Sequence, residues 1–255
     1  MDFTLNMCSR LLKAIILEGY NFQPFEEFIQ NPLPKVVILR HDVDKKPNNS
    51  LKVARIEAML GIRGTYYCRI IPEAFDANMI KEIKNLGHEI GYHYEDLALC
   101  NGDCEKALQH FEISLNELRK YYPIRTICMH GSPRSRYNNL DLWNNYNYQD
   151  YGIIGEPYID INFNEVFYIT DTGRCWDGYK VSIRDRVKNR YAFPIHTTND
   201  FIRYIELGKL PRQIMMTMHP QRWEDNFIVW TKELAWQNIK NVVKRLYIAK
   251  SAVTS

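Results

Sequence analysis

The sequence predicts a single α/β domain in which a parallel sheet is rolled into a distorted (β/α) barrel of about seven strands. Short apolar runs rich in β-branched residues alternate along the chain with segments of helical periodicity, as expected for strands joined by crossover helices. Five of the seven histidines lie in or directly after predicted strands, and four of these are at a strand's carboxyl end. In parallel barrels, chemistry assembles at that end.

The 255 residues are expected to form one barrel domain with two helical extensions. Residues 1–34 carry an amphipathic helix over 4–17, which Gly19 ends. Residues 226–255 carry a second amphipathic helix over 232–249. The motif-bearing core spans 35–225, with predicted helices at 51–60, 77–86, 103–121 and 199–207 and predicted strands at 36–39, 65–70, 88–92, 125–130, 151–161, 166–170 and 213–219.

The most informative motif is Arg40-His41-Asp42-Val43-Asp44, which ends the first predicted strand. In an extended backbone Asp42 and Asp44 point to the same face. Two like charges on one face repel each other and are costly to bury, so they need a cation or a proton between them. His41 is expected to point to the opposite face. The motif therefore predicts an active site.

Two further motifs lie at the ends of other predicted strands. Gly87-His88-Glu89-Ile90-Gly91-Tyr92-His93 follows about fifty residues later, and Met216-Thr217-Met218-His219-Pro220 lies near the end of the core. Because parallel strands end at one edge of a sheet, His93 and His219 are expected to lie near the two aspartates. His88, at the start of its strand, is expected to brace the barrel by hydrogen bonding.

In this order the three motifs resemble those of the polysaccharide deacetylase family, carbohydrate esterase family 4, also called NodB-like. The resemblance covers roughly residues 35–225 and is greatest to the branch found in surface-polysaccharide biosynthesis. It implies a distorted barrel in which a divalent metal, most often Zn²⁺, activates water to hydrolyse the N-acetyl group of an amino sugar.

By position, the resemblance assigns the general base to Asp42 and a metal ligand to Asp44. His93 corresponds to the first histidine of the family's His-(Ser/Thr)-x-x-His metal motif, and His219 to the histidine that assists the leaving group. Residues 171–176 resemble the fourth motif, which supplies a charged side chain and an aromatic wall. The candidate substrate contacts are Arg134, Asp171, Trp176 and Trp223.

One position departs from the family pattern. The second metal histidine would fall at Leu97, and a leucine side chain cannot ligate a metal. Either the metal is lost or another group supplies the third ligand. His130, at the exit of the neighbouring strand, is the first choice, Glu95 and Asp96 are alternatives, and His41 is a weaker candidate.

Composition limits the partners and the setting. A net charge of +3 is too small to indicate nucleic acid, and no apolar run approaches the roughly 20 residues that a membrane-spanning helix needs. The N-terminus carries neither the basic residues nor the cleavage site of a secretory signal, so a cytoplasmic location is expected. The six scattered cysteines are expected to be reduced.

The expected function is metal-dependent deacetylation of an N-acetylated sugar in surface-polysaccharide biosynthesis of the O-antigen or capsule type. A nucleotide- or lipid-linked sugar is expected, because residues 184–190 carry four basic residues that could meet a phosphate. Two alternatives stay open: a hydrolase of another C–N or ester bond on the same barrel, and a glycan-binding barrel without catalysis. Ser132 lacks the surroundings of a nucleophilic serine.

Overall fold

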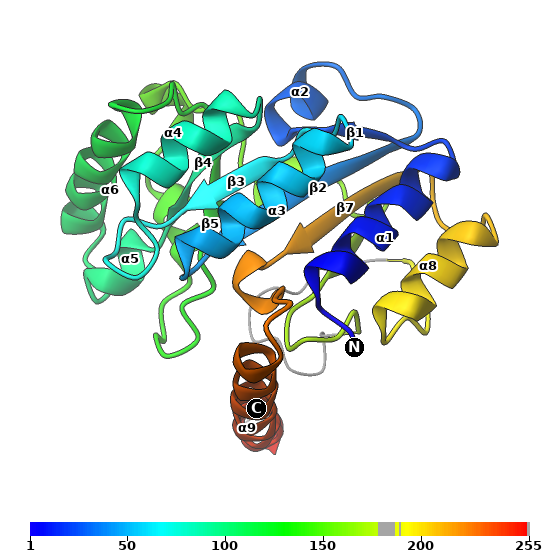
Figure 1. Cartoon of the computed structure of the whole chain (residues 1–255). Coiled ribbons are helices and arrows are strands. Elements are labelled where there is room, and N and C mark those ends of the chain that lie inside the picture. Colours follow the sequence, from blue (N-terminus) through cyan, green and yellow to red (C-terminus); the bar gives the residue numbers. More distant parts are fainter. Residues whose placement is uncertain (178–186, 189, 254–255) are drawn as a thin grey trace.

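A curled sheet of parallel strands forms the centre of the computed structural model, and helices cover its outer face (Figure 1). The structure describes residues 1–177, 187–188 and 190–253, with side chains up to residue 243. The strand order is β5-β4-β3-β2-β7-β6, and β1 pairs with the first residues of β2. The strands are β1 (Asn21–Gln23), β2 (Val36–Val43), β3 (Thr65–Cys68), β4 (Glu89–Tyr94), β5 (Ile127–Met129), β6 (Phe167–Thr170) and β7 (Gln213–Met218).

The sheet is a half-barrel. Its edge strands, β5 and β6, do not pair with each other in the part of the chain that the structure describes. The predicted α/β class and distorted barrel are thereby confirmed, with the sheet curled but open.

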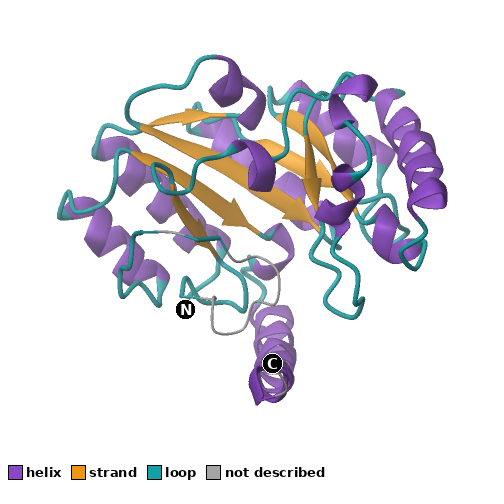
Figure 2. Cartoon of the chain, turned by 180° about the vertical axis from the view of Figure 1, so that it is seen from behind, coloured by secondary structure: helices purple, strands orange, loops and turns teal. Residues whose placement is uncertain are grey.

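Helices fill most crossovers between the strands, as Figure 2 shows from behind. Side-chain caps set several of their starts: Thr4, Asp76 and Asp103 each accept from a backbone N–H of the first turn, and Thr197 forms a capping box with Asp200. The α-helices are α1 (Leu5–Leu17), α2 (Phe25–Gln30), α3 (Pro47–Met59), α4 (Ala77–Asn85), α5 (Asp96–Leu99), α6 (Cys104–Arg119), α7 (Pro157–Asp160), α8 (Thr198–Glu206) and α9 (Phe227–Val253). Short 3-10 helices are η1 (Asn139–Asn144), η2 (Tyr148–Tyr151) and η4 (Pro220–Arg222).

The prediction of a strand over 151–161 is wrong. Gly152 has a positive φ of 69° and ends η2, and Glu156 caps α7 through its side chain. Pro157 then occupies the first turn of α7, where its missing N–H costs nothing. Turn and cap residues therefore outweigh the apolar residues of this segment, which keeps one isolated bridge, between Thr126 and Gly155.

Alternation along β2 separates two environments. Val37, Leu39 and Val43 face the helices, whereas Val36 and Ile38 pack inside the half-barrel with Phe25, Tyr67 and Met215. All eight residues of β2 are buried. Asp42 belongs to the inward-facing set, so the apolar inner core ends in a carboxylate at the carboxyl end of the strand.

The inner face of β4 requires a glycine two residues before His93. A Cβ on Gly91 would lie 2.3 Å from Cε1 of Tyr67 and 3.0 Å from the carbonyl oxygen of Thr126. Tyr67 is itself fully buried in the inner core. The absence of a side chain at Gly91 thus lets the Tyr67 ring pack beneath the histidine.

We expect Gly91→Ala to destabilise the protein by about 1–3 kcal/mol, because the added methyl group overpacks the inner core. Urea unfolding would measure the change in free energy. In a Tyr67→Ala background the same substitution should cost much less, because the clashing ring is gone. An equal cost in both backgrounds would show that Tyr67 is not the constraint.

Candidate active site

Four elements bring their polar side chains together at the carboxyl end of the sheet. Asp42 and Asp44 lie at the end of β2, His93 is on β4, His130 directly follows β5, and His219 directly follows β7. Nε2 of His93 lies 3.8 Å from Oδ2 of Asp42 and 3.6 Å from Oδ1 of Asp44. Nε2 of His219 lies 4.0 Å from an oxygen of each aspartate. The structure therefore brings together the five residues that the sequence analysis placed in the centre.

Asp44 presents one oxygen to two histidines. Its Oδ1 lies 3.6 Å from Nε2 of His93 and 3.7 Å from Nε2 of His130. Oδ1 is buried without a hydrogen-bond partner, whereas Oδ2 accepts from Gln221 at 3.1 Å. Ligand atoms of a tetrahedral zinc ion lie about 3.4 Å apart. An orphaned carboxylate oxygen at these distances from two imidazole nitrogens fits a divalent metal.

Hydrogen bonds at the other ring nitrogens orient both histidines. Nδ1 of His93 lies 2.9 Å from the carbonyl oxygen of Cys128, and Nδ1 of His130 lies 2.9 Å from Oε2 of Glu95. When Nδ1 donates a proton to such an acceptor, Nε2 keeps the lone pair that a metal needs. Burial lowers the pKa of His93 to about 4, so its ring is neutral at neutral pH.

Glu95 holds His130 and is itself held by Arg69. Nε of Arg69 donates to Oε1 of Glu95 at 2.9 Å, and Ser132 donates to Oε2 at 3.3 Å. Burial alone would raise the pKa of Glu95, but its bonds to His130 and Arg69 lower it to about 2. Glu95 is therefore an ionised partner of His130, a role that the sequence analysis missed.

The remaining alternatives for the third ligand lie elsewhere. The Asp96 carboxylate accepts from Tyr92 at 3.0 Å and pairs with His110. His41 points to the outer face, stacks on Tyr66 and lies 2.8 Å from Glu57. Leu97 packs in a separate apolar cluster with Ala107 and Leu142. His130 is therefore the candidate ligand that lies beside Asp44.

Asp42 is tied to Arg40, two residues earlier on the same face of β2. Nε and one terminal nitrogen of Arg40 each donate to Asp42 at 2.8 Å. Burial would raise the pKa of Asp42, but the charges of Arg40, His93 and His219 outweigh it and hold this pKa below its ordinary value. Asp42 therefore stays ionised beside the two imidazoles.

Asp171 orients His219. Its Oδ1 lies 2.6 Å from Nδ1 of His219, and its Oδ2 accepts from Nε1 of Trp223 at 2.8 Å. Arg222 also donates to Oδ1, at 2.7 Å. Burial would raise the pKa of Asp171, but Arg222 and His219 lower it. An ionised Asp171 fixes the His219 ring with Nε2 directed at the aspartate pair.

The predicted substrate contacts need correction. Trp176 and Trp223 are buried, at 4% and 0% exposure, and pack with Phe3 beneath the site, so neither presents a face to a sugar. Asp171 is also buried and acts through His219. Arg134 is exposed and lines a separate hollow of about 560 Å³ with Arg136 and Tyr137.

A polar groove that sequence analysis did not identify lies beside the site. Its volume is about 540 Å³, and its lining includes Asn138, Asn162, Asn164 and Lys188. Tyr158 lies in its wall and packs against the guanidinium of Arg40, 4.9 Å away. The groove thus begins next to the pair formed by Arg40 and Asp42. Amides and an ammonium group suit the hydroxyl groups of a sugar.

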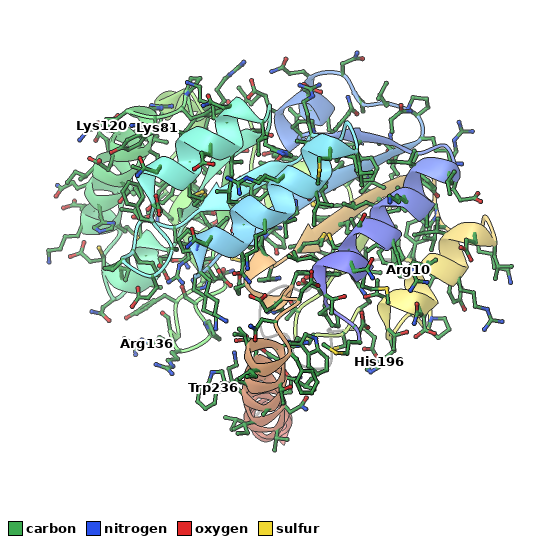
Figure 3. All side chains as sticks on the ribbon, in the orientation of Figure 1. Arg10, Lys81, Lys120, Arg136, His196 and Trp236 are labelled. Carbon is green, nitrogen blue, oxygen red and sulfur yellow. The ribbon has the colours of Figure 1, made fainter. Side chains whose placement is uncertain are left out.

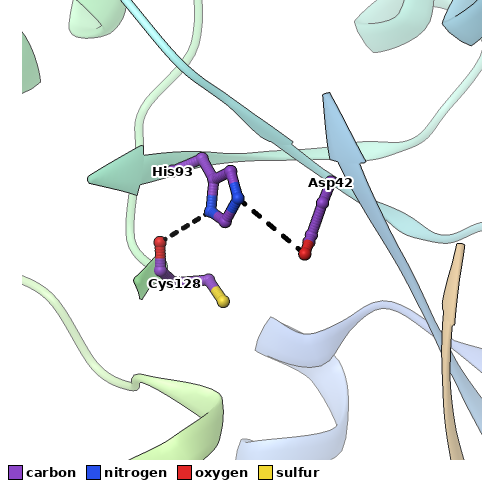
Figure 4. Close-up of side chains that lie close together, drawn as sticks. All are labelled: Asp42, His93 and Cys128. Atoms are coloured by element: carbon purple, nitrogen blue, oxygen red, sulfur yellow. Dashed lines mark hydrogen bonds and ion pairs between the residues drawn. The ribbon is translucent and has the colours of Figure 1, made fainter. Parts of the chain in front are cut away.

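A second donor set overlaps the first. Asp42, His93 and Cys128 have ligand atoms within 4.8 Å of one another (Figure 4). We favour Asp44 over Asp42, because both Asp42 oxygens already accept from Arg40, whereas Oδ1 of Asp44 has no hydrogen-bond partner. Cys128 faces the apolar inner core, and its carbonyl oxygen is what contacts His93.

Comparisons with protein-family models and with curated proteins found no match. Among solved structures, the chain is similar to a Streptococcus mutans CE4 esterase, with a TM-score of 0.47 and 13% identity over 91% of this chain and 90% of that one. A CE4-family pseudoenzyme from Bacillus anthracis matches with a TM-score of 0.46 and 14% identity, over 84% and 63% of the two chains. A family 4 carbohydrate esterase from Streptomyces lividans, in complex with acetate, matches with 0.44 and 12%, over 80% and 87%. These structures come from the family that the sequence motifs resemble, carbohydrate esterase family 4.

Proposed function

We propose that the protein is a metal-dependent hydrolase that removes the acetyl group from an N-acetylated sugar. The observation that carries the proposal is the buried, unpartnered Oδ1 of Asp44 between Nε2 of His93 and Nε2 of His130. Asp42 and His219 lie on the other side of the same carboxylate with the orientation that an acid and a base require.

Asp44, His93 and His130 would hold the metal. One carboxylate and two imidazoles are ligands that zinc commonly takes in hydrolytic sites, where a further position stays open for the reaction. When bound, such an ion polarises the amide carbonyl group and makes a water molecule more acidic. Gln221 keeps the second oxygen of Asp44 occupied, so the first remains directed at the histidines.

Asp42 would serve as the general base. It accepts the proton of the attacking water, whose oxygen adds to the carbonyl carbon of the acetyl group. Because Arg40 holds the carboxylate from the side of the strand, Asp42 is ionised and fixed in orientation. Arg40 remains charged throughout and stabilises the ionised form of its partner.

His219 would serve as the general acid. Protonated on both ring nitrogens, it donates the Nε2 proton to the amide nitrogen as the C–N bond breaks, which yields acetate and a free amine. Asp171 accepts from Nδ1 and stabilises the charged ring, as the aspartate does in other aspartate–histidine pairs. Asp171 is therefore a positioning residue.

For the substrate we propose an amino sugar of a surface polysaccharide, bound along the groove of Asn138, Asn162 and Asn164. A nucleotide or lipid carrier and a cytoplasmic location belong to the same proposal, and they rest on the sequence. In the basic run, Arg184 and Arg186 lie outside the described residues, while Lys188 lines the groove. A hydrolase of another C–N or ester bond would use the same centre, and a panel of acetylated sugars and esters separates the two.

We expect the protein to bind about one zinc ion, and we expect His130→Ala to weaken that binding by at least about a hundredfold. The matched substitution is Cys128→Ala, which should leave zinc affinity unchanged. Competition with a chromophoric chelator measures both. Loss of zinc in Cys128→Ala with none in His130→Ala would instead identify Asp42, His93 and Cys128 as the site.

Asp42→Asn should lower acetate release by about a thousandfold while the variant retains zinc, since the base is lost and the ligands are not. Thermal unfolding checks that the substitution, which leaves Arg40 without its charged partner, has not unfolded the protein. Full acetate release by this variant, or release by the wild type after complete chelation, would contradict the mechanism.

Glu95→Gln should weaken zinc binding by about tenfold to a hundredfold, because a neutral amide orients His130 less strongly than a carboxylate. Ser132→Ala removes a neighbour of the same imidazole without removing the charge, and its effect should be smaller. Equal zinc affinity in wild type and Glu95→Gln would show that Glu95 has only a structural role.

A further inference from the structure

The last helix, α9, packs against the body in an inverted manner. Its buried face is polar: Glu233 and Gln237 are 8% and 3% exposed, and Asn241 donates to the carbonyl oxygen of Gly173 at 2.8 Å. Glu233 lies 3.6 Å from Nζ of Lys45 and 3.5 Å from Nζ of Lys46. These contacts fix which side of the helix faces outward.

The outward face is apolar. Six large hydrophobic side chains on it are each between 54% and 64% exposed: Phe227, Ile228, Trp236, Ile239, Val242 and Val243. Most of them recur at spacings of three, four and seven residues, so they form one stripe along the helix. Figure 3 shows Trp236 on the outside of α9. An apolar stripe of this length on a surface helix indicates a binding surface.

The charge of α9 distinguishes between possible partners. Residues 227–253 contain five basic residues and one acidic residue, and that acid, Glu233, is turned inward to Lys45 and Lys46. The outward charge is therefore positive. A second copy would cover the stripe, but it would bring two cationic helices together without acidic partners. An anionic surface complements both the charge and the stripe.

The position of α9 points in the same direction. The helix begins soon after His219 and η4, and it projects beyond the end of the molecule at which the loop of residues 130–138 also projects (Figures 1 and 2). That loop carries the exposed Arg134 and Arg136 and contains no acidic residue. No helix among the described residues is long and apolar enough to cross a membrane.

We propose that α9 docks the protein on the surface of an anionic lipid bilayer, with its apolar stripe in the interface and its basic residues at the headgroups. Interfacial helices combine these two features, an apolar face with aromatic residues and a basic flank. Docking here would place the candidate active site next to the membrane surface. It requires no catalysis, so it stands or fails independently of the proposed reaction.

Sedimentation of the full chain with phosphatidylcholine vesicles, with and without phosphatidylglycerol, tests the proposal. We expect binding to the anionic vesicles and its loss at high salt. The double variant Trp236→Ser/Val243→Asp should weaken binding by at least about tenfold, because it places a charge and a small polar group in the stripe. The matched control is Ile113→Asp, an equally exposed isoleucine on α6, which should bind as the wild type does.

Lys232→Glu reverses one exposed charge of α9 and should weaken binding to anionic vesicles only. Light scattering on the same samples tests the alternative occupant. A dimer that the double variant dissociates, without vesicle binding by the wild type, would overturn the proposal in favour of a second copy. Equal binding to neutral and anionic vesicles, or an unaffected double variant, would overturn it as well.

Discussion

The site depends on two carboxylates placed two residues apart on the buried inner face of one strand. Asp42 and Asp44 would repel each other at this distance from water, and the fold surrounds them with positive or neutral donors on every side. Arg40 holds Asp42 from below, His93 and His130 approach Asp44, and His219 faces both. One oxygen stays without a partner after all of these contacts are made. The arrangement is complete only with a cation at that oxygen.

Curvature of the sheet makes this arrangement possible. β5 is three strands away from β2, which in a flat sheet is a separation of about 14 Å between strand axes. Yet Nε2 of His130, directly after β5, lies 3.7 Å from Asp44. The curl brings the edge of the sheet back toward its centre, and β2, with β3 and β7 on either side, receives donors from both directions. The inner core, where Gly91 leaves room for Tyr67, sustains that curl.

Periodicity in the sequence predicts most of the strands and the face on which Asp42 lies, because both follow from local rules of backbone geometry. It fails at 151–161, where Gly152 and Pro157 override an apolar run. Sequence also leaves His130, Glu95 and Asp96 as equal neighbours of the metal, since all three follow strands. What distinguishes them is contact between strands: Glu95 pairs with Arg69 and His130, and Asp96 with Tyr92. No spacing along the chain encodes those pairings.

The leucine at position 97 and the glutamate at position 95 belong to one change. Leu97 lies on α5 and packs with Ala107 and Leu142, so the helix that would carry a second histidine is instead anchored by apolar contacts. The ligand position has moved to the exit of the next strand, at His130. A histidine there needs an acceptor for its other nitrogen, and Glu95, at the start of that same helix, supplies it. Leucine at the family's ligand position is therefore consistent with a metal site that is rebuilt rather than lost, because the residues around it satisfy the requirements of the new ligand.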